Sequence, residues 1–335
     1  MTNSVLVTGA TGCLGTELTR ALVSAGERVA ILAKPGEGLG GLQPIASELE
    51  VRLGDVTEPM SLFGAFHGIS RVYHLAGIVI PVNAASDLMW QVNTIGSYNV
   101  ACAAKATRVD RLVHVSSTAA IGYPADALIA SEEFDRRDSV ATNAYSTTKY
   151  WGEKLVTDVC ADGLDVVVVN PSAVFAPGGD PRYAWSRLVD VARRGLLLAM
   201  PSGGTAVCSA RDFVDGTIRA MDRGQRGRRY ILSSANLTYQ TIGTEILRAV
   251  GREPVVPRLL PTGPLWAVSR TNAHIARLRR DPLRSPLLVP ENVDLMTRRL
   301  YYDQQRAVSE LGISQTPVQR IFCDLVDSEL IGATR

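Results

Sequence analysis

The stretch Thr8–Gly15, with the sequence TGATGCLG, decides the fold of this 335-residue chain. It follows the apolar run Val5–Val7 and precedes apolar residues that recur at helical spacing, beginning with Leu14 and Leu18. A glycine turn between a strand and a helix lets backbone N–H groups approach a pyrophosphate, whose charge the helix N-terminus favours. The alternative is a purely structural turn. The glycine spacing differs from the general G-x-G-x-x-G dinucleotide fingerprint.

The strand–helix rhythm continues outward from this turn. Continuous valine runs such as Val166–Val169 suit strands that are buried on both faces of a parallel sheet. Alternating βαβ units with short links therefore predict a doubly wound α/β domain. Strands are predicted at 28–32, 51–53, 71–75, 111–116 and 165–169, and helices at about 86–105 and 144–161.

The amino-acid composition changes after about residue 176, where proline and glycine become frequent. Arg229–Leu232 is predicted to return to the sheet as a late strand. The segment 254–290 is rich in proline, arginine and leucine without a clear period, which predicts short helices and loops that cover the substrate. We therefore expect a dinucleotide-binding domain at 1–175 and 208–250, and a smaller, mostly C-terminal substrate-binding region at 176–207 and 251–335.

Composition narrows the classes of function. The chain has 35 lysines and arginines against 33 acids, and a net charge of +2 gives no reason to expect nucleic acid as a partner. The five cysteines form no C-x-x-C pair and the four histidines lack ligand spacing, so neither a disulfide framework nor a metal site is expected. No signal peptide or membrane span is recognised, which makes the cytoplasm the expected location.

The segment Tyr145–Lys149, with the pattern Y-x-x-x-K, carries the predicted chemistry. Residues four apart lie on one face of a helix, so the lysine ammonium can approach the phenol. A nearby cation stabilises the phenolate and lowers the tyrosine pKa, which is ordinarily about 10. The tyrosine can then exchange a proton with a substrate oxygen while hydride moves to or from carbon. The spacing alone is common in helices, but downstream of the glycine turn it indicates a dehydrogenase.

Together these motifs resemble the extended short-chain dehydrogenase/reductase family, within the NAD(P)-dependent epimerase/dehydratase superfamily, whose sheet is Rossmann-like. The resemblance covers nearly the whole chain, and the stretch 227–237 and the C-terminal pattern look most like the dihydroflavonol-reductase and 3β-hydroxysteroid-dehydrogenase branches. Further matching motifs are Gly54–Thr57 (GDVT, with Glu58 in place of a second aspartate), His74–Gly77 (HLAG), Asn93–Asn99 (NTIGSYN), Tyr301–Asp303 (YYD) and Glu310–Gly312 (ELG).

The resemblance implies a catalytic set of Ser117, Tyr145 and Lys149. Thr118 is the alternative to Ser117. Asn93 is expected either to hold a water in a proton relay or to bond the backbone at a helix bend. Asn170 stands where the family's R-P-x-x-V pattern has arginine, which leaves its side chain without an implied role. Cofactor contacts are implied for Gly9, Thr11, Gly12, Cys13, Leu14, Gly15, Lys34, Asp55, Val56, Leu75, Ala76, Gly77, Lys149, Pro171 and Val174.

The residues after the predicted strand 28–32 bear on which nicotinamide is bound. An acid at the end of this strand would bind the ribose 2′-hydroxyl of NAD, and none stands there. Ala33 is followed instead by Lys34, a cation that could face the 2′-phosphate of NADP. We therefore expect NADP(H) in preference to NAD(H). The alternative is a solvated surface lysine.

Three functions fit the sequence: reduction of a ketone (or oxidation of an alcohol) on a bulky apolar substrate, nucleotide-sugar 4-epimerisation, and non-catalytic sensing of NADP. The retained Tyr145 and Lys149 argue against a sensor. Dehydratases of this family have an acid just after the catalytic hydroxyl residue, whereas Thr118 and Ala119 follow Ser117 here. The segment 254–289 supplies many apolar residues, which favours an apolar substrate such as a sterol, flavonoid or polyketide. Arginines that could instead hold a diphosphate are Arg182, Arg193, Arg194 and Arg258.

A homodimer is also expected. In the family that the chain resembles, the helices near 86–105 and 144–161 form the dimer faces. Aromatic residues there could anchor a two-fold contact, or they could complete the core of the monomer. These residues are Trp90, Tyr98, Tyr150 and Trp151.

Overall fold

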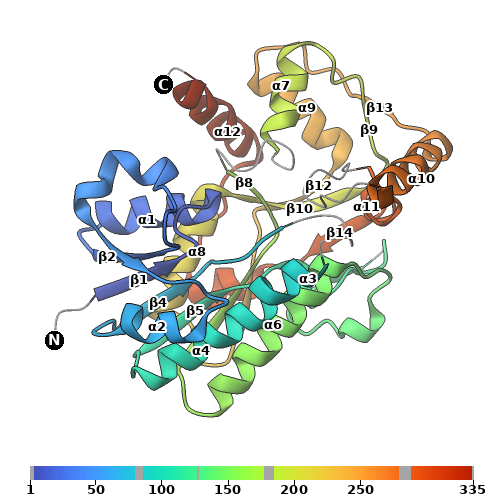
Figure 1. Ribbon diagram of the computed structural model, residues 1–335. Helices are drawn as coiled ribbons and strands as arrows, with labels where there is room; N and C mark the ends of the chain where they lie inside the picture. Colours follow the sequence, from blue (N-terminus) through green and yellow to red (C-terminus); the bar gives the residue numbers. More distant parts are fainter. Residues whose placement is uncertain (1–3, 80–85, 127, 177–184, 279–287, 334–335) are drawn as a thin grey trace.

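A seven-stranded parallel sheet forms the centre of the computed structural model, which describes residues 4–79, 86–126, 128–176, 185–278 and 288–333 (Figure 1). The strand order is β11-β7-β5-β4-β1-β2-β3, so the chain winds outward in both directions from β1. The predicted doubly wound α/β fold is therefore confirmed. The strands are β1 (Ser4–Thr8), β2 (Arg28–Ala33), β3 (Leu49–Leu53), β4 (Arg71–His74), β5 (Arg111–Val115), β7 (Val166–Pro171) and β11 (Arg229–Leu232).

Helices cover both faces of this sheet because successive strand residues point in opposite directions. Val5 and Val7 pack toward α1 (Cys13–Ser24), α8 (Ala210–Arg223) and η6 (Ala307–Leu311). Leu6, between them, packs toward the opposite layer. That layer consists of α2 (Pro59–Phe66), α4 (Ser97–Ala106) and α6 (Ala144–Ala161), and α6 has the predicted bounds.

The predicted helix 86–105 is divided into three parts. α3 (Ser86–Met89) leads into a π-helical turn, η3 (Trp90–Gly96), which continues into α4. The backbone of α6 comes very close to this turn, since a Cβ atom on Gly152 would lie 2.1 Å from the carbonyl oxygen of Asn93. That carbonyl accepts the Ser97 hydroxyl at 2.7 Å. The wider turn brings the Asn93 side chain to the end of β4.

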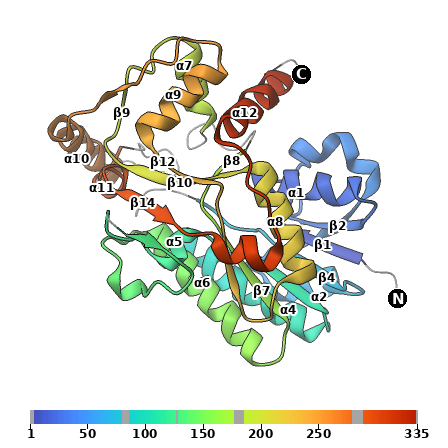
Figure 2. The same ribbon diagram turned by 180° about the vertical axis from the view of Figure 1, so that it is seen from behind.

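A second part of the molecule lies beyond the carboxyl edge of the large sheet (Figure 2). Its mixed sheet joins β12 (Ala235–Thr238), β10 (Gly204–Ser209), β14 (Arg299–Tyr302) and β6 (Ile129–Ala130), with β8 (Ala173–Phe175) beside β10. Phe175 and Phe322 lie in a separate core among α7 (Ser186–Arg193), α9 (Tyr239–Ala249) and α12 (Val318–Ala333). α9, which the predicted boundaries assign to the dinucleotide-binding domain, packs in this second core.

The region 254–290 differs from its prediction of short helices and loops. After β13 (Arg258–Leu259), which pairs with β9 (Ala199–Met200), it forms the 17-residue helix α10 (Thr262–Leu278). Polar residues such as Arg270 and Asn272 interrupt the apolar spacing of this helix and so obscure its helical period in the sequence. α11 (Pro290–Met296) packs against α10. The remaining short elements are η1 (Gly40–Glu48), α5 (Thr118–Ile121) and η4 (Arg136–Asp138).

Candidate active site

The glycine turn brings the end of β1 against the end of β4. Gly9 has a φ of 69°, and a Cβ atom there would lie 2.6 Å from the backbone nitrogen of Ala76. A Cβ atom on Gly15 would lie 2.0 Å from the carbonyl oxygen of Gly9. Gly12 is the N-cap of α1 and has no side chain with which to cap the helix. The turn therefore fits a diphosphate, because it combines close backbone approach with a helix N-terminus that its own N-cap residue leaves open.

In the first turn of α1, backbone N–H groups rather than side chains are suited to contact a cofactor. Cys13 begins the helix, and burial together with the charge of Glu17 raises the pKa of its thiol to about 11. The thiol therefore stays protonated at neutral pH. Leu14 packs on the core beneath the sheet. The predicted cofactor contacts of Cys13 and Leu14 are thus contacts that their N–H groups can make.

The segment after β4 connects the glycine turn to the predicted catalytic helix. The N–H of Ala76 donates to the Thr8 hydroxyl at 3.3 Å. A Cβ atom on Gly77 would lie 3.2 Å from Oδ1 of Asn93 and 3.9 Å from Nζ of Lys149. Leu75–Gly77 therefore runs along the carboxyl edge of the sheet, where doubly wound folds bind their ligands.

Charged residues gather at the ends of β2 and β3. Nζ of Lys34 lies 3.0 Å from Oδ2 of Asp55, so two residues predicted to contact the cofactor are ion-paired with each other. The carboxylate of Glu37 accepts the Thr11 hydroxyl at 2.6 Å and the backbone N–H of Lys34 at 2.8 Å. Sequence reasoning missed Glu37 because this acid lies four residues beyond β2. The turn sequence Pro35–Gly36, with φ of 80° at the glycine, is the signal that could have revealed it.

The predicted catalytic residues come together at the start of α6. Tyr145 and Lys149 lie one turn apart on this helix, whose N-terminus is closed by a capping box between Asn143 and Ser146. Lys149 is only 6% exposed and donates from Nζ to the carbonyl oxygen of Val115 at 2.9 Å. The end of β5 therefore fixes the lysine beneath the tyrosine.

Ser117 is the N-cap of α5 and lies two residues after the end of β5. Burial raises the pKa of Tyr145, and a hydrogen bond with the Ser117 side chain acts in the opposite direction. The Thr118 side chain is hydrogen-bonded to Tyr302 instead. Of the two hydroxyl residues that the sequence offered, Ser117 is thus the one beside the Tyr145 phenol.

Burial lowers the pKa of Lys149 to about 8, while the carboxylate of Glu153 acts to raise it. At neutral pH the lysine is therefore largely charged, and the Tyr145 phenol keeps its proton. This is the protonation state required of a tyrosine that donates a proton to a substrate oxygen.

Other predicted site residues have structural partners. Oδ1 of Asn93 accepts the backbone N–H of Ile78 at 2.8 Å, and its amide donates to the Ile78 carbonyl at 2.9 Å and to the Thr148 hydroxyl at 3.2 Å. The carbonyl of Val56 accepts the amide of Asn99 at 2.9 Å. Pro171 ends β7, and Val174 pairs with Cys208 in the second sheet.

The described side chains packed beside the Tyr145 ring are largely apolar. Met89 and Val289 are buried there and contact Ile78, Ala144 and the Tyr145 ring. Ile121 and Tyr123 belong to a second apolar cluster that the same ring contacts. Val289 thereby brings the C-terminal region close to Tyr145, the predicted catalytic tyrosine.

The arginines that could hold a diphosphate are distributed elsewhere. Arg193 lies 3.7 Å from Asp190 on its own helix, and Arg194 directly follows that helix. Arg258 is exposed in the two-stranded sheet with Ala199. Arg182 lies outside the described residues. No convergence of these side chains on Tyr145 is seen among the described residues.

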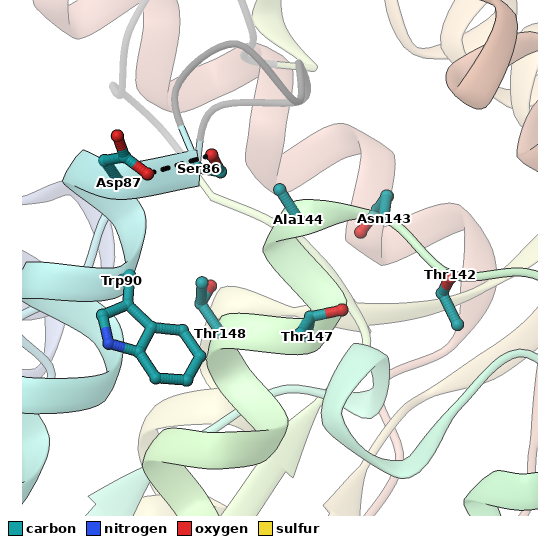
Figure 3. Close-up of a pocket in the computed structure, with 8 residues that line it drawn as sticks. All are labelled: Ser86, Asp87, Trp90, Thr142, Asn143, Ala144, Thr147 and Thr148. Carbon is teal, nitrogen blue, oxygen red and sulfur yellow. Dashed lines mark hydrogen bonds between the residues drawn. The ribbon is translucent and has the colours of Figure 1, made fainter.

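A hollow of about 430 Å³ lies between α3 and the first turns of α6 (Figure 3). Hydroxyl groups and the Trp90 indole dominate its wall, and Ser86 donates to Asp87 at its rim at 3.4 Å. Tyr145 and Lys149 are not among its lining residues, although Ala144 and Thr148 beside them are. The hollow is therefore separate from the chemistry of the Tyr145 phenol.

Among the described residues, no helix is both long enough and apolar enough to cross a membrane. No group of three or more histidine, cysteine, aspartate or glutamate side chains is placed there to hold a metal ion.

Comparisons with known proteins agree with this geometry. Residues 5–233 match the model of the NAD dependent epimerase/dehydratase family. A putative dihydroflavonol 4-reductase of Synechocystis is 28% identical over 97% of this chain and 94% of its own. Sterol demethylase protein B of Methylococcus capsulatus is 29% identical over 96% of this chain and 97% of its own.

A solved structure shares the fold at low identity. The dTDP-glucose 4,6-dehydratase of Streptomyces venezuelae, with NAD bound, superposes with a TM-score of 0.76 at 18% identity, over 97% of this chain and 96% of that one. The family match spans more than half of the chain, including the glycine turn and the Tyr145–Lys149 pair. The chain therefore belongs to the NAD dependent epimerase/dehydratase family and is an NAD(P)-dependent oxidoreductase of the extended short-chain dehydrogenase/reductase type.

Proposed function

We propose that this protein reduces a ketone, or oxidises the corresponding secondary alcohol, on a bulky and mostly apolar substrate such as a sterol, flavonoid or polyketide. The apolar packing around the Tyr145 ring, with Met89 and Val289 buried against it, carries the proposal. A polycyclic skeleton gains by burying its surface against such side chains. The names of two relatives, a dihydroflavonol reductase and a sterol demethylase protein, point to the same class.

The proposed reaction uses the residues at the start of α6. A nicotinamide dinucleotide held along Gly9–Gly15 and Leu75–Gly77 would supply hydride to the carbonyl carbon. Tyr145 donates its phenolic proton to the carbonyl oxygen, and Ser117 hydrogen-bonds the same oxygen. Lys149 stabilises the phenolate that remains. Ketone, hydride and proton thus give the secondary alcohol.

The remaining predicted contacts have different kinds of support. Asn93 orders Ile78 and Thr148 around the site, so we assign it to shaping the site before any role in a water relay. We assign Val56 and Asp55 to the adenine end of the cofactor, and Pro171 and Val174 to its nicotinamide end. Residues 1–175 and 208–250 bind the dinucleotide in this proposal, and residues 176–207 and 251–335 bind the substrate.

Two other functions are the alternatives. A nucleotide-sugar 4-epimerase would use the same tyrosine and lysine, and the family includes epimerases by name. It needs cations that converge on a diphosphate, whereas Arg193 and Arg258 are engaged or exposed elsewhere. A non-catalytic NADP sensor has no need of the Tyr145–Ser117 hydrogen bond or of the buried Lys149.

The five cysteines, all within the described residues, form no disulfide. This is the state expected of a protein that works in the reducing cytoplasm, which is the location we propose.

Replacing Tyr145 by phenylalanine should lower turnover by roughly 10²- to 10⁴-fold. The change removes the acid while keeping the ring, so affinity for the cofactor should stay nearly constant. Steady-state kinetics and fluorescence titration with NADPH measure the two quantities. Tyr150→Phe, on the same helix, is the matched control and should retain turnover. Near-normal turnover in Tyr145→Phe would refute the assignment.

NADPH should be preferred to NADH, because Lys34 offers a charge-assisted contact to a 2′-phosphate. Lys34→Ala should lower the ratio of kcat/KM with NADPH to kcat/KM with NADH. Glu37→Gln should raise this ratio, since the Glu37 carboxylate on the same turn would repel the 2′-phosphate. Equal use of both cofactors that Lys34→Ala leaves unchanged would remove Lys34 from the site, and a preference for NADH would point to Glu37 as the ribose ligand.

A panel of polycyclic ketones should drive NADPH consumption, while UDP and dTDP should bind weakly in equilibrium dialysis. The physical reason is the apolar surrounding of Tyr145, which cannot compensate for burying a diphosphate. Tight binding of either nucleotide, together with no turnover of any lipophilic ketone, would establish the epimerase alternative instead.

A two-fold homodimer through η3, α4 and α6 is also part of the proposal. Trp90, Tyr98 and Trp151 are 38%, 41% and 43% exposed, so they remain available at the surface of the monomer. Tyr150 lies edge-on to Trp151 at 5.4 Å between ring centroids. Exposed aromatic residues of this kind anchor protein interfaces.

Light scattering at micromolar concentration should therefore give the mass of a dimer, and Trp151→Glu should give that of a monomer, because a charge in the interface core is left unpaired. Arg320→Glu, on α12 away from this face, is the control. A monomeric wild-type protein at that concentration would contradict the dimer.

A further inference from the structure

A third polar residue lies on the same face of α6 as Tyr145 and Lys149. Glu153 follows Lys149 by four residues, one turn further along the helix. Its side chain is buried, with 3% of the residue exposed. A buried carboxylate is unstable unless charges and hydrogen bonds compensate it.

Two partners from neighbouring strands supply that compensation. Oε2 of Glu153 accepts the side-chain amide of Asn170, at the end of β7, at 2.8 Å. Oε1 lies 3.0 Å from Nη2 of Arg229, which begins β11. The Asn170 amide also donates to the carbonyl of Ser117 at 3.0 Å. The network thus extends from the edge strand of the large sheet to the N-cap of α5.

This arrangement accounts for the asparagine at 170. A short neutral amide fits between Glu153 and the Ser117 carbonyl, and the guanidinium that pairs with the carboxylate comes from Arg229 on the adjacent strand. The Arg229 side chain is 36% exposed, so one end of the ion pair reaches solvent. The negative charge on Glu153 is thereby held in place but only partly neutralised.

We propose that Glu153 is a positioning residue that keeps Lys149 protonated at the pH of catalysis, and that Asn170 and Arg229 fix its carboxylate for this purpose. The inference rests on the proposed function, because it concerns the lysine that supports Tyr145. It assigns a task to Asn170 and Arg229, which have no part in the proposed proton transfer.

The other groups around Lys149 do not supply a negative charge. His74 of β4 and His114 of β5 stack with their ring centroids 5.2 Å apart, and burial lowers the pKa of both, that of His74 to about 3. Both rings are therefore neutral at the pH of catalysis. Tyr145 keeps its proton, and Asn93 contributes a neutral amide near Gly77. Arg136, which donates to the Ser146 hydroxyl at 3.3 Å, adds positive charge at the start of α6.

The negative charge of Glu153 opposes the effect of burial on the pKa of Lys149. Burial lowers the pKa of Lys149 to about 8 even with the Glu153 charge present. Without that charge the pKa of Lys149 would be lower still, and a larger fraction of the lysine would be uncharged at neutral pH. A neutral Lys149 stabilises the Tyr145 phenolate less well, so the alkaline limb of the rate profile would move to lower pH.

NMR can measure this titration directly, because the chain contains only four lysines: Lys34, Lys105, Lys149 and Lys154. Protein labelled with ¹³C at the lysine ε-carbons should give four titrating signals, and Lys149→Arg assigns the one of interest. In Glu153→Gln the midpoint of Lys149 should fall by about 1 pH unit. In Arg229→Gln it should rise, because the Glu153 charge is then less compensated.

Asp158→Asn is the matched control. Asp158 lies on the same helix, is exposed, and pairs with Lys154 at 2.7 Å, so its loss should move the Lys154 signal and leave that of Lys149 in place. An unchanged Lys149 midpoint in Glu153→Gln would overturn the inference. So would a fall in Arg229→Gln, which would indicate general loosening of the site.

The rate profile separates this inference from the proposed function. The alkaline limb of kcat should shift to lower pH in Glu153→Gln, in step with the NMR midpoint. If the wild-type enzyme reduces no ketone, the proposed function fails while the NMR titration still tests Glu153. If Glu153→Gln does not fold, the expected rise in Arg229→Gln remains the test, and its absence counts against the inference.

Discussion

The close contact between the ends of β1 and β4 is the constraint on which the rest of the site depends. It exists because Gly9 has no side chain: the backbone of Ala76 occupies the space that a Cβ atom would need. Gly15 allows the same kind of contact between α1 and the turn. Because these backbones are in contact, Thr8, Leu75–Gly77 and Lys149 lie next to one another along the carboxyl edge of the sheet.

Burial then determines the pKa values of the titratable groups at this edge. Tyr145 and Lys149 are both removed from water, which raises the pKa of the phenol and lowers that of the ammonium. The two shifts move the pKa values of the groups apart, so at neutral pH the phenol keeps its proton while the lysine is largely charged. Ser117 limits the shift of the tyrosine and Glu153 that of the lysine. The hydrogen bonds of Asn170 connect these two modulating residues.

In the proposed function, the second part of the molecule selects the substrate. Its mixed sheet and helices lie beyond the carboxyl edge of the large sheet, so in the proposed function the substrate would lie between this part and Tyr145. Val289, immediately before α11, reaches the Tyr145 ring together with Met89. A relative named as a reductase and a structural neighbour named as a dehydratase share this fold. Such variety is expected where a rigid sheet holds the cofactor and the surrounding loops determine the substrate.

The sequence by itself determined the parallel sheet, the glycine turn and the Tyr145–Lys149 spacing, because each depends on local periodicity or on residues close together in the chain. α6 has its predicted bounds for the same reason. Local pattern could not reveal the π-helical turn at Asn93, which accompanies the tight contact with Gly152 on another helix. Nor could it place Glu37 against Thr11, or join Glu153, Asn170 and Arg229, which lie on three separate elements. These pairings are tertiary because burial and charge compensation act between groups that only the folded chain brings together.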